Sequence, residues 1–138
     1  MLPDMPAVFD WSIRIYYEDT DAGGIVFYAN YLKFFERART EWLRACGIDQ
    51  HALAQHDGAL FVVKSAAIDY HAPARLDDVL NLTLSIERLG KASVQFAQQA
   101  WRGDVLLCSA QVKVGCVDAA SLRPRPVPPA AAAKMLVA

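Results

Sequence analysis

The chain has 138 residues, which suits a single domain that can bury a core of its own. Hydrophobic residues make up 54% of it and the mean hydropathy is +0.16. No apolar run reaches the length of about eighteen residues that a membrane helix needs. The formal net charge of -1 gives no overall attraction for nucleic acid, so an anionic ligand would have to bind at a local cluster of cations.

The first predicted elements are a strand and a long helix. Apolar and more polar side chains alternate over residues 11–17, which predicts a strand with Trp11, Ile13, Ile15 and Tyr17 on its buried face. From Asn30 to Cys46, apolar residues recur at intervals of three and four, which predicts a helix with Asn30 as its N-cap and Gly47 just beyond its end. Its apolar face comprises Tyr31, Leu32, Phe34, Phe35, Ala38, Trp42, Leu43, Ala45 and Cys46. Because this face is wide, we expect the rest of the domain to wrap most of the helix.

Four strands are predicted after the helix. Asp49 is the expected cap of a short helix that ends at Gly58. The period then changes to two, with strands over residues 60–70, 79–89, 92–101 and 105–117. The proline-containing tail is followed by an alanine-rich piece that should form one or two helical turns. These elements predict an α+β fold, a single domain over residues 1–138 in which a five-stranded antiparallel sheet curls around one long helix.

The thiols and the N-terminal segment indicate a cytoplasmic protein. Asp4 stands where a signal peptide would carry positive charge, and a long apolar core is missing. Cys46, Cys108 and Cys116 form no C-x-x-C pair and lie in apolar segments, which is typical of buried thiols in a reducing compartment. The high apolar content also favours contacts between subunits.

The acidic loop before the long helix is the candidate for chemistry. It carries Glu18, Asp19 and Asp21, followed by two glycines. A solvated turn is one interpretation, since aspartate and glycine are ordinary turn residues. A calcium loop counted from Asp19 would need a glutamate where Asn30 stands, and an Asp-x-Asp phosphatase would need several parallel βαβ units. Asp21 is the carboxylate with a geometric reason to act, because backbone N–H groups at a helix start can polarise a carbonyl that a nearby carboxylate attacks.

Other chemical motifs are missing from the sequence. It contains neither a G-x-S-x-G elbow nor a G-x-x-x-x-G-K phosphate loop. His51 and His56 are five positions apart, whereas two metal ligands on one helical face are four apart. We therefore expect neither a metal ion nor an organic cofactor.

Two segments, YYEDTDAGGIVFYANYLKFFERARTEWLR and YHAPARLDD, carry a family resemblance. Together with the order of the strands, they resemble the hotdog-fold acyl-CoA thioesterases, specifically the Tol-Pal system-associated group and the related 4-hydroxybenzoyl-CoA thioesterase. The similarity covers the core, about residues 11–128. It implies a hydrolase that acts on acyl-CoA, or on acyl groups carried by acyl-carrier protein. It also implies a sheet wrapped around the long helix, and homodimers paired through their sheets that often form homotetramers.

The resemblance also assigns site residues. It implies that Asp21 is the nucleophile or general base, and that the backbone N–H of Tyr28 polarises the thioester carbonyl, while Asp19 shapes the loop. Many Tol-Pal-associated members have a histidine where this chain has Tyr28. The 4-hydroxybenzoyl-CoA thioesterase, like this chain, has a tyrosine there. For the CoA phosphates, the resemblance implies contacts from Arg88, Lys91, Ser93, Arg123 and Arg125. For the acyl pocket, it implies Val62 and Val63.

A function of another class stays open. The same domain could hold acyl-carrier protein or a partner in envelope biogenesis and hydrolyse little by itself. The acidic loop argues against this alternative, because a scaffold has no chemical need for it.

Overall fold

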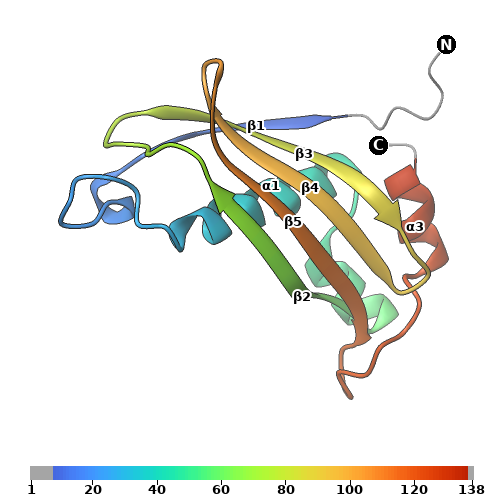
Figure 1. The fold of residues 1–138 in the computed structure, drawn as a ribbon. Coiled ribbons are helices and arrows are strands. Elements are labelled where there is room, and N and C mark those ends of the chain that lie inside the picture. The colour runs from blue at the N-terminus through green and yellow to red at the C-terminus, as the bar shows by residue number, and fades with distance from the viewer. Residues whose placement is uncertain (1–7, 137–138) are drawn as a thin grey trace, which may run out of the picture.

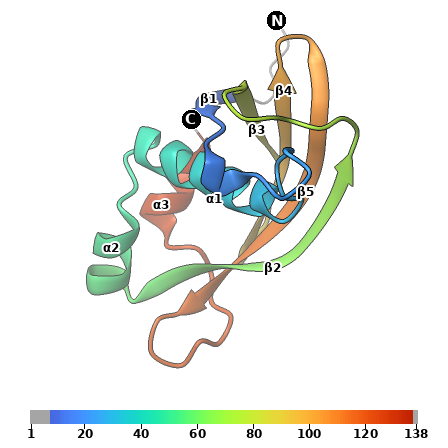
Figure 2. The same ribbon diagram turned by 90° about the vertical axis from the view of Figure 1, so that its left-hand side faces the viewer.

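The computed structural model describes residues 8–136, in which five strands form one antiparallel sheet (Figure 1). Along the sheet, the strands are β1 (Phe9–Arg14), β3 (Val79–Leu89), β4 (Ser93–Arg102), β5 (Val105–Asp118) and β2 (Ala59–Tyr70). The helices are α1 (Asn30–Ala45), α2 (Gln50–Ala52), α3 (Pro129–Leu136), a 3-10 turn (Tyr17–Asp19) and a π-helical turn (Leu53–Asp57). The sheet curves around α1 (Figure 2), so the predicted α+β architecture is confirmed.

The core lies between α1 and the concave face of the sheet. On β3, Leu80, Leu82 and Leu84 are buried, as the alternating pattern predicted, and the observed bounds of this strand equal the predicted ones. From the helix, Phe34 and Phe35 are almost completely buried against them. Each such side chain removed from water stabilises the fold by roughly 1.5 to 3 kcal/mol.

The helix is covered on one side rather than on most of its circumference. Tyr31, Phe34, Phe35, Ala38, Trp42 and Leu43 are buried, as predicted. In a single copy of the chain, Leu32 is 45% exposed and Ala45 is also exposed. The prediction that both are buried is therefore wrong for the single chain. The sheet contacts a single stripe of the helix, and the apolar side chains beyond that stripe face outward.

The first strand is shorter than predicted. It ends at Arg14, and Tyr17, predicted to face inward, is 80% exposed in a 3-10 turn. The reason is a side chain farther along the loop: Asp19 Oδ2 accepts a hydrogen bond from the Tyr16 N–H at 2.9 Å, which turns the chain away from the sheet. The alternation of apolar and polar residues runs on to Tyr17 in the sequence, but the strand ends earlier, where Asp19 binds the Tyr16 N–H.

A buried amide joins α1 to the middle of the sheet. Gln98 on β4 is 1% exposed. Its Nε2 donates to the Phe35 carbonyl of α1 at 2.9 Å, and its Oε1 accepts a hydrogen bond from Arg39 Nη1 at 2.9 Å. Buried polar groups are stable only when such partners are present. This contact fixes the helix on the sheet, and the sequence pattern had not indicated it.

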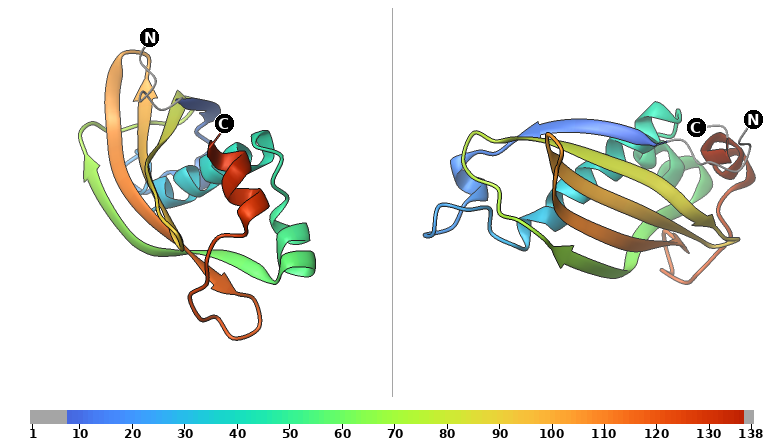
Figure 3. Two further views of the ribbon diagram at one scale, coloured as in Figure 1. Left: turned by 90° about the vertical axis from the view of Figure 1, so that its right-hand side faces the viewer. Right: turned by 45° about the horizontal axis from the view of Figure 1, so that its top comes forward.

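The predicted caps of the short helix and the predicted terminal helix are present. Asp49 accepts hydrogen bonds from the N–H groups of His51 and Ala52, and Gly58 ends the following turn in the left-handed region at φ +62°. Lys134 of α3 donates from Nζ to the Gly47 carbonyl at 3.0 Å, which holds the tail against the end of α1 (Figure 3). Within residues 8–136, no helix is both long and apolar enough to cross a membrane.

Two of the three thiols are buried as predicted, and the third is not. Cys108 and Cys116 are buried, whereas Cys46 is half-buried. Burial raises the pKa of each, to about 12 for Cys108. Because the thiolate is the reactive form, we expect an alkylating reagent at neutral pH to label Cys46 first and Cys108 only after unfolding. Mass spectrometry of native and denatured samples measures this order, and equally fast labelling of Cys108 in the native protein would contradict it.

Candidate active site

Asp21 lies at the tip of a small hairpin between β1 and α1. Thr20 and Val26 form an isolated bridge, and the Asp21 N–H donates to the Ile25 carbonyl at 2.9 Å. Gly24 has φ +78°, which a glycine adopts without strain. The Asp21 side chain is exposed, and its Oδ1 accepts a hydrogen bond from Gly23 N–H at 2.8 Å. Within residues 8–136 its other oxygen, Oδ2, accepts none, so one oxygen orients the carboxylate and the other is available.

Asp19 is the anchor of this hairpin. It is 7% exposed, and its carboxylate accepts the Tyr16 N–H. Its backbone carbonyl accepts hydrogen bonds from Phe27 N–H and from Asn30 Nδ2, both at 2.9 Å. Asn30 was predicted to cap the helix; that is wrong, because Ala29 holds the N-cap position and the Asn30 amide is used to bind the loop. The expected role of Asp19 in shaping the loop is confirmed by these contacts.

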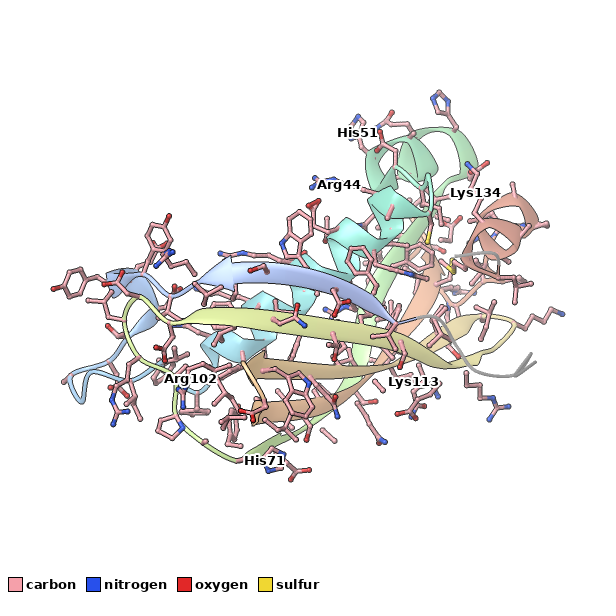
Figure 4. The ribbon with its side chains drawn as sticks, turned by 90° about the horizontal axis from the view of Figure 1, so that it is seen from above. Arg44, His51, His71, Arg102, Lys113 and Lys134 are labelled. Carbon is pink, nitrogen blue, oxygen red and sulfur yellow. The ribbon has the colours of Figure 1, made fainter. Side chains whose placement is uncertain are left out.

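The second resemblance segment, residues 70–78, supports the first. Ile25 forms a bridge with Arg75, and the Val26 N–H donates to the Ala74 carbonyl at 2.8 Å. Arg102, labelled in Figure 4, holds this segment in turn, because its Nη1 donates to the Pro73 carbonyl at 2.9 Å and to Asp78 Oδ2 at 3.1 Å. Two stretches about 50 positions apart in the sequence thus join to support the hairpin.

Tyr28 stands two positions before the first residue of α1. Among residues 8–136, its N–H has no hydrogen-bond acceptor, while its carbonyl accepts the Tyr70 hydroxyl at 2.9 Å. A free N–H at the positive end of a helix dipole is suited to a carbonyl oxygen or an oxyanion. Tyr28 as a residue is 63% exposed.

A pocket of about 300 Å³ adjoins Tyr28 and is lined by Ile25, Val26, Tyr31, Tyr70, His71, Ala72 and Pro73. The Tyr70 hydroxyl fixes the backbone at Tyr28, and the Tyr31 and Tyr70 rings meet edge to face at 5.7 Å. Burial raises the pKa of Tyr31 to about 12, which keeps its hydroxyl protonated. Sequence reasoning missed Tyr70, because its position at the end of a strand carried no signal of a contact with Tyr28.

The residues expected at the CoA phosphates lie far from Asp21. Arg88, Lys91 and Ser93 surround the β3–β4 turn, which is at the opposite end of the sheet from the hairpin (Figures 1 and 3). The tail comes to the same turn, because the Val127 N–H donates to the Lys91 carbonyl at 2.9 Å. Within a single copy of the chain, the tail therefore lies at the β3–β4 turn, and both are remote from the hairpin that carries Asp21.

The two tail arginines differ in their surroundings. The Arg123 side chain is exposed. Arg125 is half-buried, and its Nη1 donates to the carbonyls of Asp57 at 2.7 Å and Gly58 at 3.2 Å. Part of the Arg125 guanidinium thus holds the turn before β2, which leaves Arg123 the freer cation.

Val62 and Val63 point to different sides of β2. Val63 lines a cavity of about 110 Å³ between α1 and the sheet, together with Phe61, Val94, Phe96 and Val114. Val62 is not among the residues that line it, because neighbours on a strand alternate between the two faces. The lining of this cavity includes neither Asp21 nor Tyr28, so the role of Val62 and Val63 in an acyl pocket stays a prediction.

The family follows from the sequence match. Residues 23–109 match the thioesterase superfamily, so the chain belongs to that superfamily. Within it, the chain is 46% identical over 116 residues to the acyl-CoA thioesterase YbgC of Haemophilus influenzae, covering 84% of this chain and 85% of that relative. The resemblance to the acyl-CoA thioesterases that was stated from the sequence is therefore confirmed.

Solved structures agree on the fold. A probable thioesterase from Bartonella henselae has a TM-score of 0.84 at 35% identity, covering 88% of this chain and 100% of that chain. A 4-hydroxybenzoyl CoA thioesterase mutant in complex with 4-hydroxybenzoyl CoA has a TM-score of 0.85 at 20% identity, covering 93% and 98% of the two chains. The second likeness concerns the hotdog fold alone.

Proposed function

We propose that this protein hydrolyses acyl-CoA thioesters, with Asp21 as nucleophile or general base. The observations that carry the proposal are a Tyr28 N–H that is free among residues 8–136, at the start of α1, and an oriented, exposed Asp21 carboxylate on the hairpin that leads into this helix. The acyl-CoA thioesterase named among the relatives supports the same substrate class.

The proposed reaction needs few groups. The thioester carbonyl oxygen accepts the Tyr28 N–H, which stabilises the negative charge that develops on it. Asp21 either removes a proton from a water molecule that attacks the carbonyl carbon, or attacks that carbon itself and forms an acyl-aspartyl anhydride that a water molecule then hydrolyses. In both routes CoA leaves as its thiolate. A thiol has a pKa of about 8.5 and leaves readily, so strong acid assistance is unnecessary. The product is a carboxylic acid and free CoA.

Two copies of the chain are needed for a complete site in this proposal. The hairpin and the basic residues of the β3–β4 turn lie at opposite ends of one sheet. β2 is a sheet edge of twelve residues, and its middle is exposed. An unpaired edge strand is a ready surface for pairing with another chain. We propose a homodimer paired through this edge, with dimers associating into a tetramer, which light scattering after gel filtration can measure.

For the CoA phosphates, we expect Arg123→Ala to raise the KM for an acyl-CoA about fivefold, because an exposed charge contact contributes up to about 1 kcal/mol. A thioester of the same acyl group on pantetheine lacks the nucleotide and should show an unchanged KM. Adding Arg125→Ala should raise the KM further but also lower stability, because the contacts to Asp57 and Gly58 are lost. Equal changes in KM for both thioesters after Arg123→Ala alone would contradict this role.

The test of the reaction class is thiol release from the purified protein over acetyl, medium-chain, long-chain and 4-hydroxybenzoyl CoA. Hydrolysis of any of these supports the proposal, and their ranking identifies the acyl group. A folded protein that releases thiol from none of them contradicts it. That outcome would favour the second function, a protein that binds acyl-carrier protein or an envelope-biogenesis partner, including the Tol-Pal system.

A further inference from the structure

Lys64 occupies an irregular position on the edge strand β2. The register between β2 and β5 shifts between Val63 and Ser65, so Lys64 lies in a β-bulge, a feature that redirects a side chain. Its stem lies across Gly115 of β5, where an added Cβ atom would be 2.8 Å from Lys64 Cε and 2.9 Å from Cδ. Any larger residue at Gly115 would displace this stem. The glycine therefore creates the space that holds Lys64 in place.

The Lys64 stem lies on the face of the sheet that points away from α1. Val114 and Cys116 are buried on the α1 side, so Gly115 between them faces the other way. Gly115 pairs with Ser93 of β4, which places the Ser93 side chain on the same outer face beside the lysine stem. Ser93 is one of the residues expected at the CoA phosphates.

Other cations share this outer face. Lys113 lies two positions before Gly115 on β5, on the side of the sheet opposite α1 (Figure 4). It pairs with Gln95, which in turn pairs with Arg88 of β3. In the part of the chain that the structure describes, the ion pairs are Arg44 with Glu41 and Arg102 with Asp78, so none of these cations is neutralised by a carboxylate.

Two carboxylates, Asp69 and Glu87, also lie on this outer face. Glu87 precedes Arg88, and its carboxylate accepts hydrogen bonds from Gln95 Nε2 at 3.4 Å and from Gln111 Nε2 at 3.2 Å. Lys64, Lys113 and Arg88 thus place positive charge on three strands near the Ser93 hydroxyl, beside the negative charge of Glu87. An anion with several oxygens, such as a phosphate, matches that arrangement.

We propose that Lys64 binds a phosphate of the CoA portion of the substrate on this outer face, together with Arg88, Lys91 and Ser93. The inference rests on the proposed acyl-CoA hydrolase and extends its phosphate site to the edge strand. A free lysine loses rotamer freedom when it orders around a ligand. Here the stem is already ordered over Gly115 in the folded protein, so the ammonium group can bind with less loss of entropy.

The test is Lys64→Met, which keeps most of the stem and removes the charge. We expect the KM for an acyl-CoA to rise about threefold to tenfold with kcat unchanged. The KM for the same acyl group on pantetheine should not change. Gly115→Ala should raise the KM for acyl-CoA similarly with the ammonium intact, because it displaces the stem. Lys33→Met, at an exposed lysine of α1, is the matched control and should change neither KM.

An unchanged KM for acyl-CoA in Lys64→Met would overturn this proposal, and so would an equal rise for both thioesters. Failure of the proposed function looks different, because the wild-type protein would then hydrolyse neither thioester. In that case, calorimetry with CoA itself tests whether Lys64 contacts a phosphate of CoA. Weaker CoA binding by Lys64→Met than by the wild type would support the phosphate contact, whereas equal binding or none would overturn it.

Discussion

Asp21→Asn should retain the fold and lose at least about a hundredfold in kcat, a typical loss for a group that takes part in proton transfer or attack. Asparagine keeps an oxygen that can accept the Gly23 N–H, so the hairpin turn has no reason to change. The amide is neither a nucleophile nor a base. Thiol release measured with saturating acyl-CoA gives kcat, and circular dichroism with thermal unfolding checks the fold.

The matched control is Glu18→Gln, a change of the same kind at an exposed acid of the same loop. It should keep most of the activity, because the Glu18 carboxylate, unlike that of Asp21, is oriented by no hydrogen bond among residues 8–136. If Asp21→Asn retained most of the wild-type kcat, Asp21 would not be the catalytic group. If both variants lost activity equally, loop charge in general would be responsible.

Phe35→Ala should lower the free energy of unfolding by about 3 to 5 kcal/mol, the usual loss for a buried phenylalanine. The Phe35 side chain is fully buried between α1 and the sheet, where its removal leaves a cavity. The free energy of unfolding of a small domain is only about 5 to 15 kcal/mol, so this single change should bring the domain close to unfolding. Urea denaturation at one protein concentration measures the difference, since association would otherwise alter it.

Leu32→Ala is the corresponding control on the exposed side of α1. Leu32 is 45% exposed, and a surface substitution usually changes stability by about 0.5 kcal/mol or less. A small loss for Phe35→Ala would contradict the packing described for α1. A large loss for Leu32→Ala would show that another copy of the chain covers this side of the helix in solution.

The sheet and its helix could be predicted because each depends on a local period. Leu80, Leu82 and Leu84 alternate with polar residues, and the strand they predict has the observed bounds. Gly58 ends a helical turn because of its own backbone freedom. Each of these signals lies within a few neighbouring residues, so the sequence alone is sufficient to predict the strand or the helix end that it marks.

The candidate site depended less on local pattern. A catalytic role for Asp21 could be proposed from the acidic loop beside a helix start and from the family resemblance. The donation from Asn30 to the Asp19 carbonyl and the contact of Tyr70 with Tyr28 join residues that are 11 and 42 positions apart. No spacing in the sequence encodes those partners.

By itself, the sequence determined the order of helix and strands, most of the buried positions and the family, because these depend on local periods and on two specific segments. Only the tertiary structure decided which groups are free. It left the Tyr28 N–H without a partner, engaged Arg125 with two carbonyls and laid Lys64 over Gly115. Whether a polar group is available to a ligand depends on what else reaches it in space, and that is a property of the packed chain.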